Sequence, residues 1–131
     1  MEISKSFIRF YLIIWIIIAI FSFGLQFFLA DIITNASVWE KSSGWQQHLA
    51  LYNIGLLIAI IYALVLNNRE IMRFLTVVLI VFSLIIGSFN LISMILVSSI
   101  AIYHIFMVFI HFFASLLGIY LYVLDSKSTI L

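Results

Sequence analysis

Four long runs of apolar residues follow one another along the chain, separated by short polar stretches. The runs cover residues 7–30, 47–66, 74–97 and 102–124. Each is about as long as a helix must be to cross the hydrocarbon core of a bilayer, and none alternates polar and apolar positions as membrane-barrel strands do. The pattern predicts an all-α integral membrane four-helix bundle that forms a single membrane domain over residues 1–131.

The polar stretches predict how this bundle is oriented in the membrane. Five of the six cationic residues fall on one predicted side: Lys5, Arg9, Arg69, Arg73 and Lys127. Only Lys41 falls on the other side. Because cytoplasmic loops are enriched in Lys and Arg, both termini and the tight basic turn at residues 67–73 are predicted to be cytoplasmic. The first run is longer than the apolar core of a signal peptide, so we expect it to be retained.

The stretch of residues 31–47 is predicted to be the only substantial loop, on the outer side of the membrane. Its tryptophans Trp39 and Trp45 fit the aromatic belt at the level of the lipid headgroups. Ile32, Ile33 and Val38 indicate that part of this loop lies on the membrane interface or caps the bundle.

Composition agrees with a bilayer environment. Of the 131 residues, 66% are hydrophobic and 8% are charged, whereas soluble domains carry about 25% charged residues; the mean hydropathy is +1.34. A net charge of +1 gives no reason to expect a nucleic-acid partner. The absence of cysteine excludes disulfides and thiolate metal sites. The lipid bilayer is therefore the expected partner, and a membrane-protein partner or a homo-oligomer is compatible with it.

Seven polar side chains within the apolar runs or at their ends are the candidate ligand-binding residues. They are Gln26, Gln46, His48, Asn53, Asn90, His104 and His111. An unpaired polar group costs several kcal/mol in hydrocarbon, so such groups either bond to neighbouring helices or face a wet pocket. A helix rises about 1.5 Å per residue, so the depth of a residue follows from its distance to the end of its run. The candidate residues within the runs are thereby placed in the outer half or at the centre of the membrane.

Helical spacing predicts that these polar residues face the interior of the bundle. Residues three, four or seven positions apart share one face of a helix. Three such stripes are Trp15, Ala19, Ser22 and Gln26; Ser83, Gly87, Asn90 and Met94; and His104, Val108, His111, Ser115, Gly118 and Tyr122. Small residues such as Gly87 and Gly118 allow helices to approach closely. The polar faces are therefore expected to converge.

Several functions fit this arrangement. The first is an outward-facing polar pocket that binds, or helps to transport, a small ligand or lipid-like molecule. The alternatives are an accessory subunit packed against a larger membrane complex, with the polar residues serving only as interhelical hydrogen bonds, and a membrane redox protein that binds quinone or haem. The haem alternative rests on His104 and His111, with His48 as the third histidine. Two histidines on one straight helical face cannot sandwich a haem. No acidic residue lies within the four runs, so catalysis has little support and no metal site is predicted.

The segment Gln46–Leu57, QQHLALYNIGLL, resembles the second-helix signature of small bacterial four-helix membrane proteins of the DoxX-like kind. Uncharacterised relatives of that kind open this helix with a glutamine, followed by a Tyr-Asn or similar pair, a small residue and leucines. Gly87-Ser88-Phe89 is similar to a small-residue motif in their third helix. The first run departs from some relatives because it lacks their acidic or histidine residues. The resemblance implies a multi-pass protein of the plasma membrane of a bacterium, with at most a link to quinones or membrane redox partners.

Overall fold

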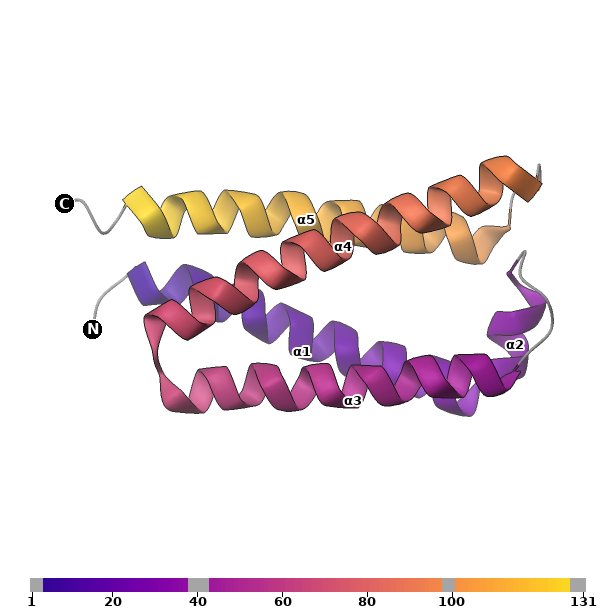
Figure 1. Cartoon of the computed structure of the whole chain (residues 1–131), viewed down its shortest axis with the longest axis horizontal. Coiled ribbons are helices and arrows are strands. Elements are labelled where there is room, and N and C mark those ends of the chain that lie inside the picture. Colours follow the sequence, from indigo (N-terminus) through magenta and orange to yellow (C-terminus); the bar gives the residue numbers. More distant parts are fainter. Residues whose placement is uncertain (1–3, 38–42, 98–100, 128–131) are drawn as a thin grey trace.

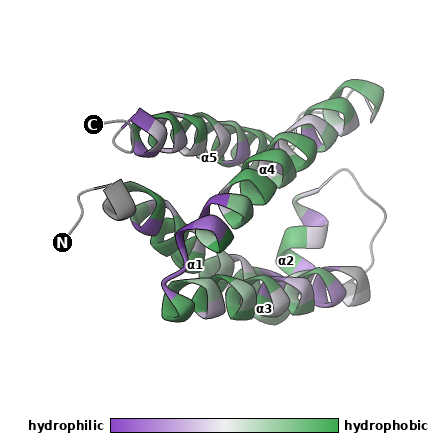
Figure 2. Ribbon diagram, turned by 60° about the vertical axis from the view of Figure 1, so that its left-hand side comes forward, coloured by the Kyte–Doolittle hydropathy of each residue, from purple (hydrophilic) through white to green (hydrophobic). Residues whose placement is uncertain are grey.

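The computed structural model describes residues 4–37, 43–97 and 101–127. Its five helices are α1 (Ser4–Phe28), α2 (Ala30–Asn35), α3 (Ser43–Leu66), α4 (Arg69–Val97) and α5 (Ile102–Lys127). All but α2 are long and apolar enough to cross a membrane, and the described residues contain no strand. The predicted all-α bundle of four spanning helices is confirmed. Hydrophobic residues make up most of each long helix in Figure 2, as contact with lipid requires.

The long helices form two antiparallel pairs, which we call the α1–α3 pair and the α4–α5 pair (Figure 1). The pairs meet closely at the end that holds both described termini and the turn between α3 and α4, which we call the basic end. They diverge toward the opposite end, where α2 lies, which we call the α2 end (Figures 1 and 2). The bundle is therefore wedge-shaped rather than evenly packed.

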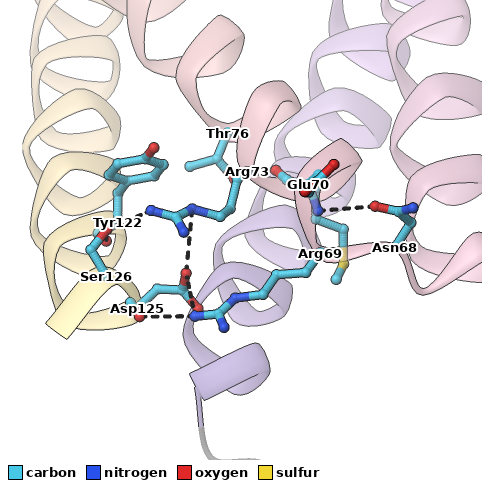
Figure 3. A network of polar contacts seen from close by, with 9 residues as sticks. Asn68, Arg69, Glu70, Arg73, Thr76, Tyr122, Asp125 and Ser126 are labelled. Carbon is cyan, nitrogen blue, oxygen red and sulfur yellow. Dashed lines mark hydrogen bonds and ion pairs between the residues drawn. The ribbon is translucent and has the colours of Figure 1, made fainter. Parts of the chain in front are cut away.

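A polar network at the basic end fastens α4 to α5 (Figure 3). The side chain of Asp125 is fully buried, and Arg69 Nη2 donates to its Oδ2 at 3.1 Å and to its backbone oxygen at 3.0 Å. Arg73 Nε lies 3.7 Å from the same Oδ2, and its guanidinium stacks 4.9 Å from the centre of the Tyr122 ring. Two cations thus lie beside one buried anion, which offsets part of the cost of burying its charge.

This network corrects two predicted helix boundaries. Helix α4 begins at Arg69 rather than at residue 74, because Asn68 Oδ1 caps it by accepting hydrogen bonds from the backbone N–H groups of Glu70 and Ile71 at 3.0 and 3.2 Å. Helix α5 continues past residue 124 to Lys127, because Asp125 finds its partners on α4. Residues 69–73 of the predicted turn and residues 125–127 of the predicted tail are therefore helical.

The predicted loop at residues 31–47 also contains helical structure. Helix α1 ends at Phe28, and the chain then forms α2, in which Ile33 is buried and Ile32 is exposed. Helix α3 begins at Ser43. Part of this stretch thus packs on α1 and α3. Whether the rest lies on the membrane interface stays a prediction, and Val38 lies outside the described residues.

The two helix pairs are closest around Tyr11 and Gly118. The Tyr11 hydroxyl donates to the backbone oxygen of Ala114 at 3.1 Å, and a Cβ on Gly118 would lie 2.6 Å from Ile80 and 2.7 Å from Tyr11. Only glycine fits at this crossing. Trp15, one turn further along α1, packs edge-on against Tyr11 with ring centroids 6.4 Å apart. Toward the α2 end the helices of the two pairs diverge (Figure 1).

Candidate functional site

A cavity of about 570 Å³ lies between the two helix pairs on the α2 side of Trp15. All four long helices contribute to its wall, which is mainly aliphatic and aromatic and includes no charged residue among those described. Five aromatic side chains both line it and are exposed at the surface of the bundle: Phe21, Tyr52, Phe82, Phe89 and Phe106. The cavity is therefore partly open sideways, where the apolar surface faces lipid.

One polar cluster on the cavity wall joins α1 to α3. Asn53 Nδ2 donates to Gln26 Oε1 at 2.9 Å and to Ser22 Oγ at 3.2 Å. Ser22 and Gln26 are one turn apart on α1, so a single amide on α3 reaches both. Among the described residues none donates to Asn53 Oδ1, and Asn53 is only half-buried. The Tyr103 side chain of α5 also interacts with Gln26, which brings the second helix pair to this cluster.

A second polar contact joins α4 to α5. Asn90 Nδ2 donates to the backbone oxygen of Ile86 at 2.8 Å, which leaves its Oδ1 facing His104 Nδ1 at 2.7 Å. Because an amide oxygen only accepts, the proton of this bond belongs to His104 Nδ1. Asn90 lines the cavity, whereas the fully buried His104 lies behind it. His104 therefore positions Asn90 and does not itself reach the cavity.

The inner end of the cavity is formed by Trp15 and His111. Their ring centroids are 6.5 Å apart, and both side chains are buried. A Cβ on Gly87 would lie 3.3 Å from His111 Cβ, so this glycine lets α4 approach α5 beside the imidazole. Nδ1 of His111 is buried and has no hydrogen-bond partner within the described part of the chain. Buried polar atoms without a partner are rare, and ligands or waters commonly meet them.

The seven predicted site residues fall into two groups. Four line the cavity and face the interior: Gln26, Asn53, Asn90 and His111. Three do not line it: Gln46, which is buried in the first turn of α3, the buried His104, and the exposed His48. In the described ranges no group of three His, Cys, Asp or Glu side chains is placed to hold a metal ion.

Some wall residues carry no signal in the sequence. Ser22 belongs to a predicted stripe, but Tyr103 and Phe106 resemble the many aromatic residues that simply face lipid or the membrane interface. Their place at the cavity depends on the angle between the helix pairs. No family model, curated protein or solved structure matches the chain, so its function has to be inferred from the cavity itself.

Proposed function

We propose that this multi-pass membrane protein binds a lipid-like molecule in the cavity between its two helix pairs, within the plasma membrane. The observation that carries the proposal is an apolar cavity with a small set of polar side chains on its wall. Sites for small molecules have this composition, in which apolar walls provide most of the affinity and a few polar groups fix the orientation. A volume of about 570 Å³ falls within the usual range of such sites.

The position of the cavity favours an occupant that arrives from the bilayer. Its exposed aromatic edges, such as Phe21 and Phe106, lie among apolar residues that face lipid. A molecule with an alkyl chain can enter there without crossing water, and its chain replaces lipid contacts with protein contacts. Toward the basic end the Tyr11–Gly118 crossing closes the bundle. This closure supports binding rather than conduction through the protein.

The proposed DoxX-like relationship is compatible with this function. Asn53, from the Tyr-Asn pair of the resembling segment, is at the centre of the polar cluster on the cavity wall. The proposal itself does not depend on that relationship, because it follows from the shape and polarity of the cavity.

Trp15 provides a direct test, because it lines the cavity but is only 2% exposed. A Trp39→Phe/Trp45→Phe variant leaves Trp15 as the only tryptophan. In phosphatidylcholine vesicles, we expect dibrominated stearyl alcohol to quench the fluorescence of Trp15. The quenching should saturate at a low mole fraction of the alcohol. Quenching that only rises in proportion to the bromine content of the bilayer would contradict the proposal, since it would report bulk lipid rather than a site.

A matched pair of variants separates the cavity from the lipid-facing surface. Ile18 and Ile110 line the cavity, so Ile18→Phe/Ile110→Phe in the same background should fill it and remove the saturable quenching. Ile17 and Ile105 lie on the same two helices but are exposed to lipid. Ile17→Phe/Ile105→Phe makes the same chemical change outside the cavity and should leave the quenching intact.

A further inference from the structure

The volume of the cavity limits the size of its occupant. An apolar cavity of about 150 Å³ holds one benzene molecule. At the same density, a cavity of about 570 Å³ has room for roughly 20 non-hydrogen atoms. This is the size of one long alkyl chain with a small polar group, and it is too small for a phospholipid with two chains.

The charge of the cavity wall limits the head group of the occupant. None of the described wall residues is Asp, Glu, Lys or Arg. The charged cluster around Asp125 lies at the basic end beyond the Tyr11–Gly118 crossing, where its members are bonded to one another. An ionised head group inside the cavity would lose its hydration without gaining a counter-charge, which is strongly unfavourable at membrane depth.

The polar cluster on the wall has hydrogen-bonding capacity to spare. Asn53 Oδ1 can accept a bond, and the Ser22 hydroxyl, which accepts from Asn53, keeps its own proton to donate. Within the described part of the chain neither group is otherwise used. One acceptor beside one donor is the arrangement that a hydroxyl or an amide group satisfies fully.

We infer that the cavity selects a single-chain amphiphile whose polar end is uncharged and both donates and accepts a hydrogen bond, such as an alcohol or a primary or secondary amide, and excludes the same chain with an ionised end. The head group is bound by Ser22 and Asn53, and the alkyl chain extends along the apolar wall toward Trp15. This inference rests on the proposed function and adds the chemical class of the ligand.

Competition experiments test the inference with matched chains. The reporter is dibrominated stearyl alcohol quenching Trp15 in phosphatidylcholine vesicles, and the competitors are octadecanol, octadecyl sulfate and octadecyltrimethylammonium. All three share one chain and differ in head-group charge. We expect octadecanol to relieve the quenching and both ions to be at least about tenfold less effective.

The outcomes separate the inference from the proposed function. If the reporter never quenches Trp15 saturably, both fail. If it does, but octadecyl sulfate or octadecyltrimethylammonium competes as well as octadecanol, the charge selection fails while the binding function stands. A Glu40→Gln/Lys41→Gln variant should behave like the parent; if it loses the selection, the outer loop and not the cavity wall is responsible, and the inference is overturned.

Two substitutions at Asn53 test where the head group lies. Asn53→Leu should reduce competition by octadecanol to the level of octadecane, which has no head group, because the hydrogen bonds are lost. Asn53→Lys should instead admit octadecyl sulfate, because it supplies the missing counter-charge. If His111→Leu removes the preference for the alcohol and Asn53→Leu does not, the head group lies at the inner end of the cavity and our placement is wrong.

Discussion

The crossing of Tyr11 and Gly118 makes a sharp prediction about stability. Replacing Gly118 with alanine would place a Cβ 2.6 Å from Ile80 Cγ1 and 2.7 Å from both Cζ and Oη of Tyr11. A non-bonded Cβ essentially never lies this close to another heavy atom, so the aromatic ring must move or the helices must separate. Movement of the ring also threatens the hydrogen bond from Tyr11 to the backbone of Ala114.

The expected magnitude combines three effects. Inserting a methyl group into a closely packed site costs about 1 to 3 kcal/mol, and losing the Tyr11 hydrogen bond costs about 1 kcal/mol. The higher helix propensity of alanine offsets about 1 kcal/mol of this loss. We therefore expect Gly118→Ala to lower the free energy of unfolding by about 2 kcal/mol.

Two other glycines provide controls of the same chemical type. A Cβ on Gly55 meets nothing within 4 Å, and a Cβ on Gly87 approaches His111 Cβ to 3.3 Å. Far-ultraviolet circular dichroism during titration with dodecyl sulfate in mixed micelles measures the unfolding of each variant. The expected order of stability is Gly55→Ala, then Gly87→Ala, then Gly118→Ala. If Gly118→Ala unfolds together with Gly55→Ala, the helix pairs do not meet at this crossing as described.

Three further predictions concern the buried carboxylate, the cavity and the topology. Asp125→Leu should lower the free energy of unfolding by about 1 to 3 kcal/mol, less than for fully buried partners because the two arginine side chains are 20% and 30% exposed and can reach water; an unchanged dodecyl sulfate midpoint would contradict this. Asn53→Leu and His111→Leu should both weaken the saturable quenching of Trp15. Asn53→Leu should also cost about 1 kcal/mol of stability, because Asn53 bonds to Gln26 and Ser22 of α1, whereas His111→Leu should change stability little because Nδ1 of His111 has no partner in the described part of the chain; unchanged quenching in both variants would mean that these side chains serve only in helix packing. In intact cells an impermeant thiol reagent should label Ser43→Cys and not Ser128→Cys, and the opposite labelling would reverse the predicted orientation.

The pattern of residues along each helix determined how many helices span the membrane and which of their polar side chains face inward. The number of spanning helices follows from the length of the apolar runs, because a backbone in hydrocarbon must satisfy its own hydrogen bonds. The inward direction of Gln26, Asn90 and His111 follows from the helical period, which places residues three or four apart on one face. The side of the membrane on which the termini lie is still a prediction from the distribution of Lys and Arg.

Contacts between distant segments decided the rest. The sequence pattern places His104 and His111 on one face of α5, but only the neighbouring helix makes His104 a partner of Asn90 and leaves His111 at the cavity. The continuation of α5 past residue 124 was hidden for the same reason, because a charged residue extends a helix when its counter-charge lies on another helix, as Arg69 does for Asp125. The start of α4 at Arg69, by contrast, follows from a local cap by Asn68.

The cavity itself is a property of the tertiary structure. Its opening depends on how far the two helix pairs diverge beyond the Tyr11–Gly118 crossing. The period of a helix fixes which residues share a face, but the angle at which two faces meet depends on the size of the side chains at the crossing and on all the helices that pack there. The sequence therefore determined which polar groups turn inward, and only the packing of the helix pairs decided which of them surround a shared space.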